Sequence, residues 1–228
     1  MGFLTGLQVA LFFKDRVERP DQIATNVNDT LGNAFDRMPT VIPVPEDAPV
    51  EIPVVMMTSS KLPYQLNFSR KRVDLILPHS GPVERGEEQR NQFVEFAKNF
   101  SDQMAKVTKI NRIGVISHYY HPIDDIPKYL NSRFTNHSID KKAEEISIHY
   151  NIKKKKNGFI TNNLVTIQEQ NFMNGDEMAV KGVYFMFDKN NHPSDKSLQK
   201  NFIHEMIDGI DSYLGINILD FISGGDKK

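Results

Sequence analysis

The side chains whose types could bind a metal lie close together between residues 118 and 125. His118, His121, Asp124 and Asp125 combine imidazole and carboxylate groups, which are the ligands of hydrolytic metal centres. Their spacing argues against convergence, because residues three apart on a continuous strand point to opposite faces. Pro122 permits a bend, so a metal-dependent hydrolase is one alternative. We favour instead an end of a sheet where histidine and tyrosine side chains turn their polar tips to water.

Two short basic runs could contact phosphate groups or an acidic partner surface. They fall at predicted hairpin turns and consist of Arg70, Lys71, Arg72 and of Lys153, Lys154, Lys155, Lys156. A nucleic-acid-binding or nucleic-acid-processing component is therefore a second alternative. Charged hairpin ends also keep a protein soluble and discourage pairing between sheet edges, and we favour this simpler interpretation. Aromatic residues do not alternate with the basic ones, so a groove of stacked bases is not indicated.

Nucleophilic catalysis has little support in the sequence. It has no cysteine, no serine within a Gly-x-Ser-x-Gly elbow and no glycine-rich phosphate loop after a strand. His204 and Glu205 lack the second histidine of a zinc protease helix. A metal nuclease uses carboxylates with a lysine, and the sequence offers Asp176, Glu177, Lys181 and Asp188. This match is weak, since acids and lysines are common at strand ends. We expect no catalytic residue, no metal and no cofactor.

The composition is typical of an ordinary water-soluble protein. The 228 residues are 39% hydrophobic and 25% charged, with a formal net charge of −1. These values favour a folded core and give no overall attraction to nucleic acid or anionic lipid. The apolar start, residues 1–13, is predicted to be a strand and not a signal peptide, and no apolar run reaches the roughly 20 residues of a membrane span. The absence of cysteine is typical of a reducing compartment, so we expect a cytoplasmic location.

A long helix followed by a buried strand organises the rest of the chain. From residue 84 onward, apolar residues recur at steps of three and four, which predicts a helix with one buried face: Phe93, Phe96, Ala97, Phe100, Met104 and Val107. The period then changes to two through residue 120, with apolar residues on both faces. This pattern predicts a strand in the interior of a sheet.

The elements before this helix complete a first unit. We predict a strand at 7–13, a helix from Pro20 stopped by Pro39, a proline-rich linker at 41–53, a strand at 54–58 and a hairpin at 64–77. This order is that of a ferredoxin-like (split βαβ) arrangement, in which two helices cover one face of an antiparallel sheet.

The second half is predicted to be a β-meander followed by a C-terminal helix. A short helix at 123–134 precedes strands at 145–152, 158–168 and 178–187, with turns at Asn157-Gly158 and Asn174-Gly175. The last helix is expected at 193–214, ended by Gly215. We therefore predict an α+β fold with a ferredoxin-like half, residues 1–121, and a meander half, residues 122–228, packed as one unit.

The layout and one short motif resemble a known protein family. The hairpin, the long helix and the strand entered through Asn111-Arg112-Ile113-Gly114-Val115 are similar to a sporadically distributed family of uncharacterised bacterial proteins with an Arg-x-Gly-containing strand. The family's arginine-tyrosine-asparagine continuation is replaced here by Ile116-Ser117-His118. Members are often found near mobile elements and phage-defence genes, which implies an accessory or sensor role in a bacterial defence-type complex. The resemblance supplies no catalytic residues.

Together these features favour a non-enzymatic interaction or assembly module. The chain has a well-patterned core, no convergent catalytic set and a sheet whose edges could pair with another chain. We expect a protein partner or self-association and no membrane contact. Fold alone cannot exclude the two alternatives, because sheets of this type serve many functions.

Overall fold

The computed structural model describes residues 2–45, 47–79, 84–135, 145–172 and 180–224. The helices are α1 (Pro20–Thr30), α2 (Glu87–Val107), α3 (Ile126–Arg133), α4 (Lys200–Asp208) and α5 (Ile218–Ser223). The strands are β1 (Phe3–Phe13), β2 (Thr40–Val41), β3 (Val55–Thr58), β4 (Gln65–Phe68), β5 (Arg72–Leu77), β6 (Ile110–Pro122), β7 (Ser147–Lys156), β8 (Phe159–Phe172), β9 (Val180–Asn191), β10 (Ser212–Tyr213) and β11 (Ile216–Asn217).

Strands from both halves of the chain join one sheet of nine strands. Its order is β2-β3-β4-β5-β1-β6-β9-β8-β7, and neighbouring strands pair antiparallel. The pairing of β6 with β9 connects the first half to the meander β7-β8-β9. The expectation of an α+β fold built on an antiparallel sheet is therefore confirmed.

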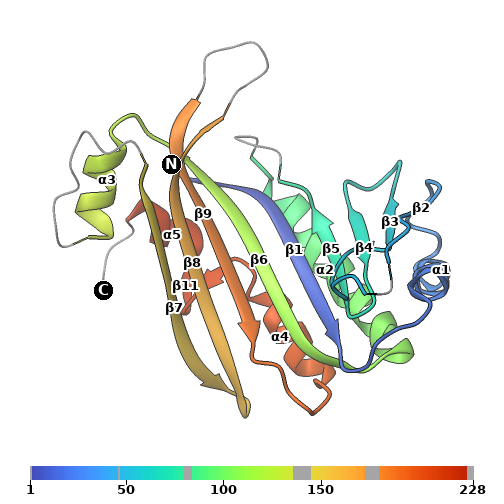
Figure 1. Cartoon of the computed structure of the whole chain (residues 1–228). Coiled ribbons are helices and arrows are strands. Elements are labelled where there is room, and N and C mark those ends of the chain that lie inside the picture. The colour runs from blue at the N-terminus through green and yellow to red at the C-terminus, as the bar shows by residue number, and fades with distance from the viewer. Residues whose placement is uncertain (1, 46, 80–83, 136–144, 173–179, 225–228) are drawn as a thin grey trace.

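Helices α2, α4 and α5 lie on one face of this sheet (Figure 1). The core forms between them and the strands, where Leu7, Val9 and Leu11 of β1 meet Phe93 and Phe100 of α2, all fully buried. Helix α1 packs against α2, and Tyr129 of α3 donates a hydrogen bond to the carbonyl of Ile222 in α5. Among the described residues, no helix lies across the opposite face, which we call the open face (Figure 1).

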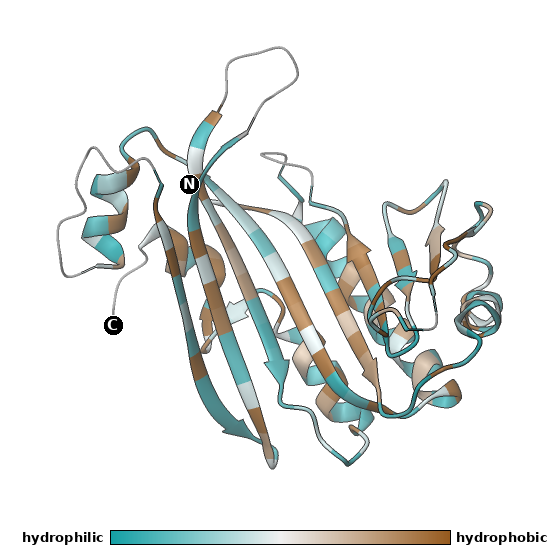
Figure 2. Ribbon diagram, viewed as in Figure 1, coloured by the Kyte–Doolittle hydropathy of each residue, from teal (hydrophilic) through white to brown (hydrophobic). Residues whose placement is uncertain are grey.

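Alternation along each strand separates the two faces of the sheet. Hydrophobic and polar bands follow one another along β6 and β8, and β9 changes from hydrophobic to polar toward its end (Figure 2). Ile113 and Val115 of β6 point toward the helices and are buried, whereas Arg112 and Ile116 point to the open face and are partly exposed. The period of two therefore places polar side chains of distant segments on one surface.

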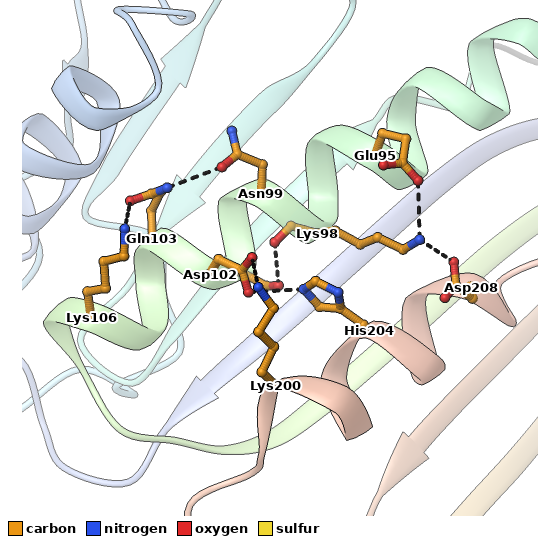
Figure 3. Close-up of polar contacts among 10 residues, drawn as sticks. Glu95, Lys98, Asn99, Asp102, Gln103, Lys106, Lys200, His204 and Asp208 are labelled. Atoms are coloured by element: carbon orange, nitrogen blue, oxygen red, sulfur yellow. Dashed lines mark hydrogen bonds and ion pairs between the residues drawn. The ribbon is translucent and has the colours of Figure 1, made fainter.

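A network of ions and amides ties α2 to α4 (Figure 3). Asp102 accepts hydrogen bonds from Lys200, at 2.7 Å, and from His204, at 3.0 Å. Lys98 bridges to Glu95 at 3.2 Å and to Asp208 at 2.5 Å. Beneath these contacts the apolar faces of both helices cover the sheet.

The first helix is shorter than predicted. It ends at Thr30, because Gly32 and Asn33 adopt left-handed backbone angles of φ 69° and 56° that a helix cannot continue through. Met38, which fell within the predicted helix, is 92% exposed, and Val107, predicted on the buried face of the long helix, is 44% exposed. A short β2 also forms where the proline-rich linker was predicted to begin.

The last helix is interrupted. Helix α4 begins at Lys200 and ends at Asp208 with Gly209 as its cap, so the predicted helix at 193–214 is wrong at both ends. A two-stranded hairpin of β10 and β11 follows, turning through Leu214 (φ 54°) and Gly215 (φ 94°), and α5 completes the chain. Ile210, Tyr213 and Leu214, which fell within the predicted helix, therefore lie in or beside this hairpin.

The turn between β7 and β8 is the predicted one. Asn157 and Gly158 have φ 49° and 84°, the backbone of a two-residue hairpin turn. The preceding lysines belong to β7 itself and not to the turn. The second predicted turn, Asn174-Gly175, lies outside the described residues. No helix in the described part of the chain is long and apolar enough to span a membrane.

Candidate interaction surface

Cation–π contacts organise one end of the open face. In the sheet register Phe12 of β1 lies between Arg72 of β5 and Arg112 of β6. The two guanidinium carbons lie 5.0 Å and 4.6 Å from the centre of its ring. Such contacts fix planar cations against an apolar platform.

A buried carboxylate extends this cluster along β5. Asp74 lies 2.6 Å from the Arg72 guanidinium and accepts a hydrogen bond of 2.8 Å from the Gln8 amide. Burial raises the pKa of Asp74, while Arg72 and Gln8 act in the opposite direction. The side chain is therefore a partly desolvated acceptor held by two neighbouring strands.

A second partly buried carboxylate, Asp188, lies on β9. Arg112 donates to the side-chain oxygen of Asn190 at 3.3 Å, and Asn190 donates to Asp188 at 2.9 Å. Asn162 of β8 also donates to Asn190 at 3.0 Å. Burial raises the pKa of Asp188, opposed by Asn190 and the two arginines. The Arg112 Nε atom is buried and has no hydrogen-bond partner, an exception among buried polar atoms.

Two histidines and a tyrosine form the other end of the open face. The rings of His79 and His118 stack at 5.6 Å, and His118 Nδ1 lies 2.5 Å from the Tyr184 hydroxyl oxygen. A Cβ at Gly6 would lie 2.9 Å from the His79 backbone, so glycine permits this approach. Burial lowers the pKa of His118 to about 4, which makes the imidazole a weak base.

The four residues considered for a metal centre lie apart. His118 faces the open side, whereas His121 faces the helices and contacts the Tyr129 ring at 4.8 Å. Asp125 accepts a hydrogen bond from the Lys128 amide at the start of α3, and Asp124 is exposed. Within the described residues, no group of three or more histidine and acidic side chains is placed to hold a metal ion.

The first basic run is engaged by its own chain. Arg70 donates to the carbonyl oxygens of Val44 and Pro45 at 3.3 Å and 3.1 Å. Lys71 donates to the carbonyl of Lys14 at 2.9 Å, and Arg72 binds Asp74 as described. These three side chains anchor loops and the sheet.

The second basic run divides between the two faces of the sheet. Lys154 and Lys156 pair in register with Thr161 and Phe159, which point toward the helices, and Lys156 bridges to Glu205 of α4 at 2.8 Å. Lys153 pairs with Asn162 and therefore shares the open face. Strand alternation thus separates lysines that are consecutive in sequence.

Sequence reasoning missed the central residues of the open face. Phe12, Asp74, Asp188 and Asn190 come from three strands that are far apart in the chain. The signal that the sequence offers is a polar residue on a strand whose adjacent positions are apolar and buried, as at Arg112 in β6. Their convergence depends on strand order, which the pattern does not contain.

No protein-family model matches this chain, and neither the curated proteins nor the solved structures that were compared contain a match.

Proposed function

We propose that the chain is a non-enzymatic interaction module that assembles with a second copy of itself through the open face of the sheet. The observation that carries this proposal is the cross-strand cluster of Arg72, Phe12 and Arg112 on a face that no described helix covers. Arginine, aromatic residues and methionine are enriched at protein interfaces, and Tyr184 and Met186 add to the same face.

The side chains of this face are already held in place. Asp74 is fixed by Gln8 and Arg72, and Asn190 is fixed by Arg112, Asp188 and Asn162. Ordering a long side chain on binding costs about 0.5–1.5 kcal/mol, so a face ordered in advance loses less on association. This preorganisation supports a recognition surface over a merely solvated one.

The sheet edges are less suited to pairing than the open face. At one edge β2 has only two residues, and Pro43 follows it closely. At the other edge β7 carries Lys153 to Lys156. Short strands, proline and lysine are the features that protect edges from other chains. Assembly by strand addition is therefore disfavoured.

Charge balance points to a second copy as the occupant. On β5, β6 and β9 the face presents two arginines, Arg72 and Arg112, and two acids, Asp74 and Asp188, while Lys153 lies at the β7 edge. An interface around a two-fold axis must be complementary to itself, and a balanced set can place arginines of one copy near acids of the other. Ile116 and Leu164, which flank Asp188 in the register, supply apolar area at the centre.

The finer fold and family assignments belong to this proposal. The order β4-β5-β1-β6 with α1 and α2 between its strands supports a ferredoxin-like first half. The resemblance to the bacterial family supports an accessory or sensor subunit of a defence-type complex.

The test is the oligomeric state as a function of concentration. We expect light scattering and sedimentation velocity to show a monomer–dimer equilibrium in the wild type. Ile116→Arg and Leu164→Arg should each weaken it by at least about tenfold, because a charge would be desolvated without a partner at the centre of the interface. Circular dichroism would verify that both variants fold.

Val107→Arg is the matched control. It adds the same charge at an exposed apolar position on the helix side. A wild type that stays monomeric up to the highest soluble concentration contradicts the proposal. So does a dimer that Val107→Arg weakens as much as the two face variants do.

A further inference from the structure

Three lysines from the helix side of the sheet converge on a pocket away from the open face, and Lys155 of β7 also borders it. Lys154 and Lys156 reach it from β7, and Lys189 reaches it from β9. The register explains this convergence, because Lys189 pairs with Asn163 and Lys154 pairs with Thr161, both buried on the helix side of β8. The hairpin β10-β11 contributes the remaining wall through Ser212 and its turn. The pocket has a volume of about 220 Å³.

The pocket wall carries cations and small donors but no carboxylate. Thr161, Asn163 and Ser212 are the neutral polar side chains that line it. The Thr161 hydroxyl donates to the Lys154 carbonyl at 3.1 Å and the Asn163 amide to the Ile152 carbonyl at 3.0 Å, so both side chains fix the pocket wall. Glu205 of α4 forms an ion pair with Lys156 at 2.8 Å and accepts a hydrogen bond from the Asn157 side-chain amide at 3.0 Å. Two carboxylates, Glu205 and Asp211, therefore act on three ammonium groups, and the excess positive charge is local even though the chain as a whole carries a formal charge of −1.

Lys189 combines partial burial with the lack of a direct ion pair, whereas Lys154 is exposed to water and Lys156 is paired with Glu205. Lys189 is half-buried, and within the described residues its ammonium forms no hydrogen bond or ion pair. It lies against the end of α4, where a Cβ added at Gly209 would overlap Lys189 Nζ. Burial lowers the pKa of Lys189, and nearby Lys156 lowers it further, against the weaker influence of Glu205 and Asp211. An anion bound beside Lys189 would raise its pKa and so oppose the effects of burial and of Lys156.

We propose that the pocket formed by Lys154, Lys156 and Lys189 beneath the β10-β11 hairpin binds the phosphate group of a small molecule. Three ammonium groups, with three donors each, offer more donors than the two oxygens of a carboxylate can use, and they match the oxygens of a phosphate. The volume is below the roughly 300–1,000 Å³ of sites for larger ligands, which limits the occupant to inorganic phosphate or a small phosphate monoester.

Calorimetric titration with inorganic phosphate and with glycerol 3-phosphate tests the proposal, at a constant ionic strength set by chloride. We expect saturable binding of at least one of them with one site per chain. Tighter binding of glycerol 3-phosphate would identify a monoester as the ligand class, and equal or tighter binding of inorganic phosphate would identify the free ion. Lys189→Met and Lys154→Met should each weaken binding by about tenfold, the loss of one charge-assisted hydrogen bond.

Lys153→Met is the matched control, because it removes one charge from the same strand but from the opposite face. It should change the affinity less than about twofold. Lys154 is exposed, so its variant keeps the test informative even if Lys189→Met perturbs folding. Absence of saturation at about 10 mM of both ligands overturns the proposal. Equal weakening by Lys153→Met overturns it as well, and so does binding of a single-stranded oligonucleotide when neither small phosphate binds.

Discussion

The imidazole of His118 on β6 and the phenol of Tyr184 on β9 form a diagonal pair on the open face, with Nδ1 and the hydroxyl oxygen 2.5 Å apart. Burial, together with the smaller effect of the adjacent His79, lowers the pKa of His118 to about 4. Burial also raises the pKa of Tyr184 to about 12. Both rings are therefore neutral near pH 7, and their short contact joins two uncharged groups.

Acidification should destabilise the protein through His118. Its folded pKa lies below the unfolded value of about 6.5, so the unfolded chain takes up the proton first. The stabilising contribution is complete above pH 6.5 and is lost as the pH falls toward 4. Between pH 8 and pH 5 we expect this residue to account for a loss of about 2 kcal/mol in the free energy of unfolding. Urea titrations of wild type and His118→Gln across this range measure the difference.

Deleting the Phe100 ring should strongly lower the free energy of unfolding. The side chain is fully buried under α2, so Phe100→Ala should cost about 3–5 kcal/mol. Phe96 is only partly buried, against Phe35 and Tyr64, and Phe96→Ala should cost less. Val107→Ala at an exposed position is the control, expected within about 0.5 kcal/mol of wild type. Thermal melts that rank Phe96 above Phe100 would show that the helix is rotated from the orientation seen here.

Gly182 should not tolerate a methyl group. A Cβ there would overlap the Tyr120 ring and lie 2.6 Å from the His121 carbonyl oxygen. We expect Gly182→Ala to cost about 1–3 kcal/mol through overpacking. Gly114→Ala is matched on the neighbouring strand, because its Cβ would meet Asn190 and Ala10 at 3.7 Å and 3.8 Å, ordinary contact distances. Equal denaturation midpoints for the two variants would contradict the packing described for Tyr120.

The ions between α2 and α4 should contribute little and depend on salt. Burial raises the pKa of Asp102, but bonds from Lys200 and His204 outweigh it and leave the pKa lowered (Figure 3). Asp102→Asn should cost about 1 kcal/mol or less at low salt, and less at high salt, because partly exposed pairs are screened. Asp29→Asn, at an exposed position on α1, should be neutral. Urea midpoints at two salt concentrations decide between this account and a larger role for the network.

Local patterns were sufficient for the elements that have one strong period. Helix α2 and strand β6 were recognised because their apolar residues repeat at 3.6 and then at 2, and the Asn157-Gly158 turn because its residues accept left-handed angles. The breaks in the first and last helices were missed for a related reason. Ile210 and Tyr213 continue a helical spacing by coincidence, although Gly209 had already capped α4.

The candidate surfaces could not be derived from the sequence, because each depends on strand order. Arg112 and Arg72 share Phe12 only because β1 lies between β5 and β6. Lys189 joins Lys154 only because β8 lies between β7 and β9. Composition predicted solvated lysines, and a run of four consecutive lysines gave no sign that alternate members face different sides of a sheet.

The central place of β1 has a consequence for how the chain reaches its native state. Its neighbours in the sheet are β5 and β6. Phe3 can therefore pair with Tyr120 only when the strands and the long helix that lie between β1 and β6 in sequence no longer separate them. Contacts over such sequence separations require closure of large loops, which slows folding. A fragment that stops before β6 would leave a row of unpaired amides along the most apolar strand of the sheet, open to aggregation. Folding is therefore expected to be delayed until β6 is available, and a chaperone that shields β1 during this interval would raise the yield.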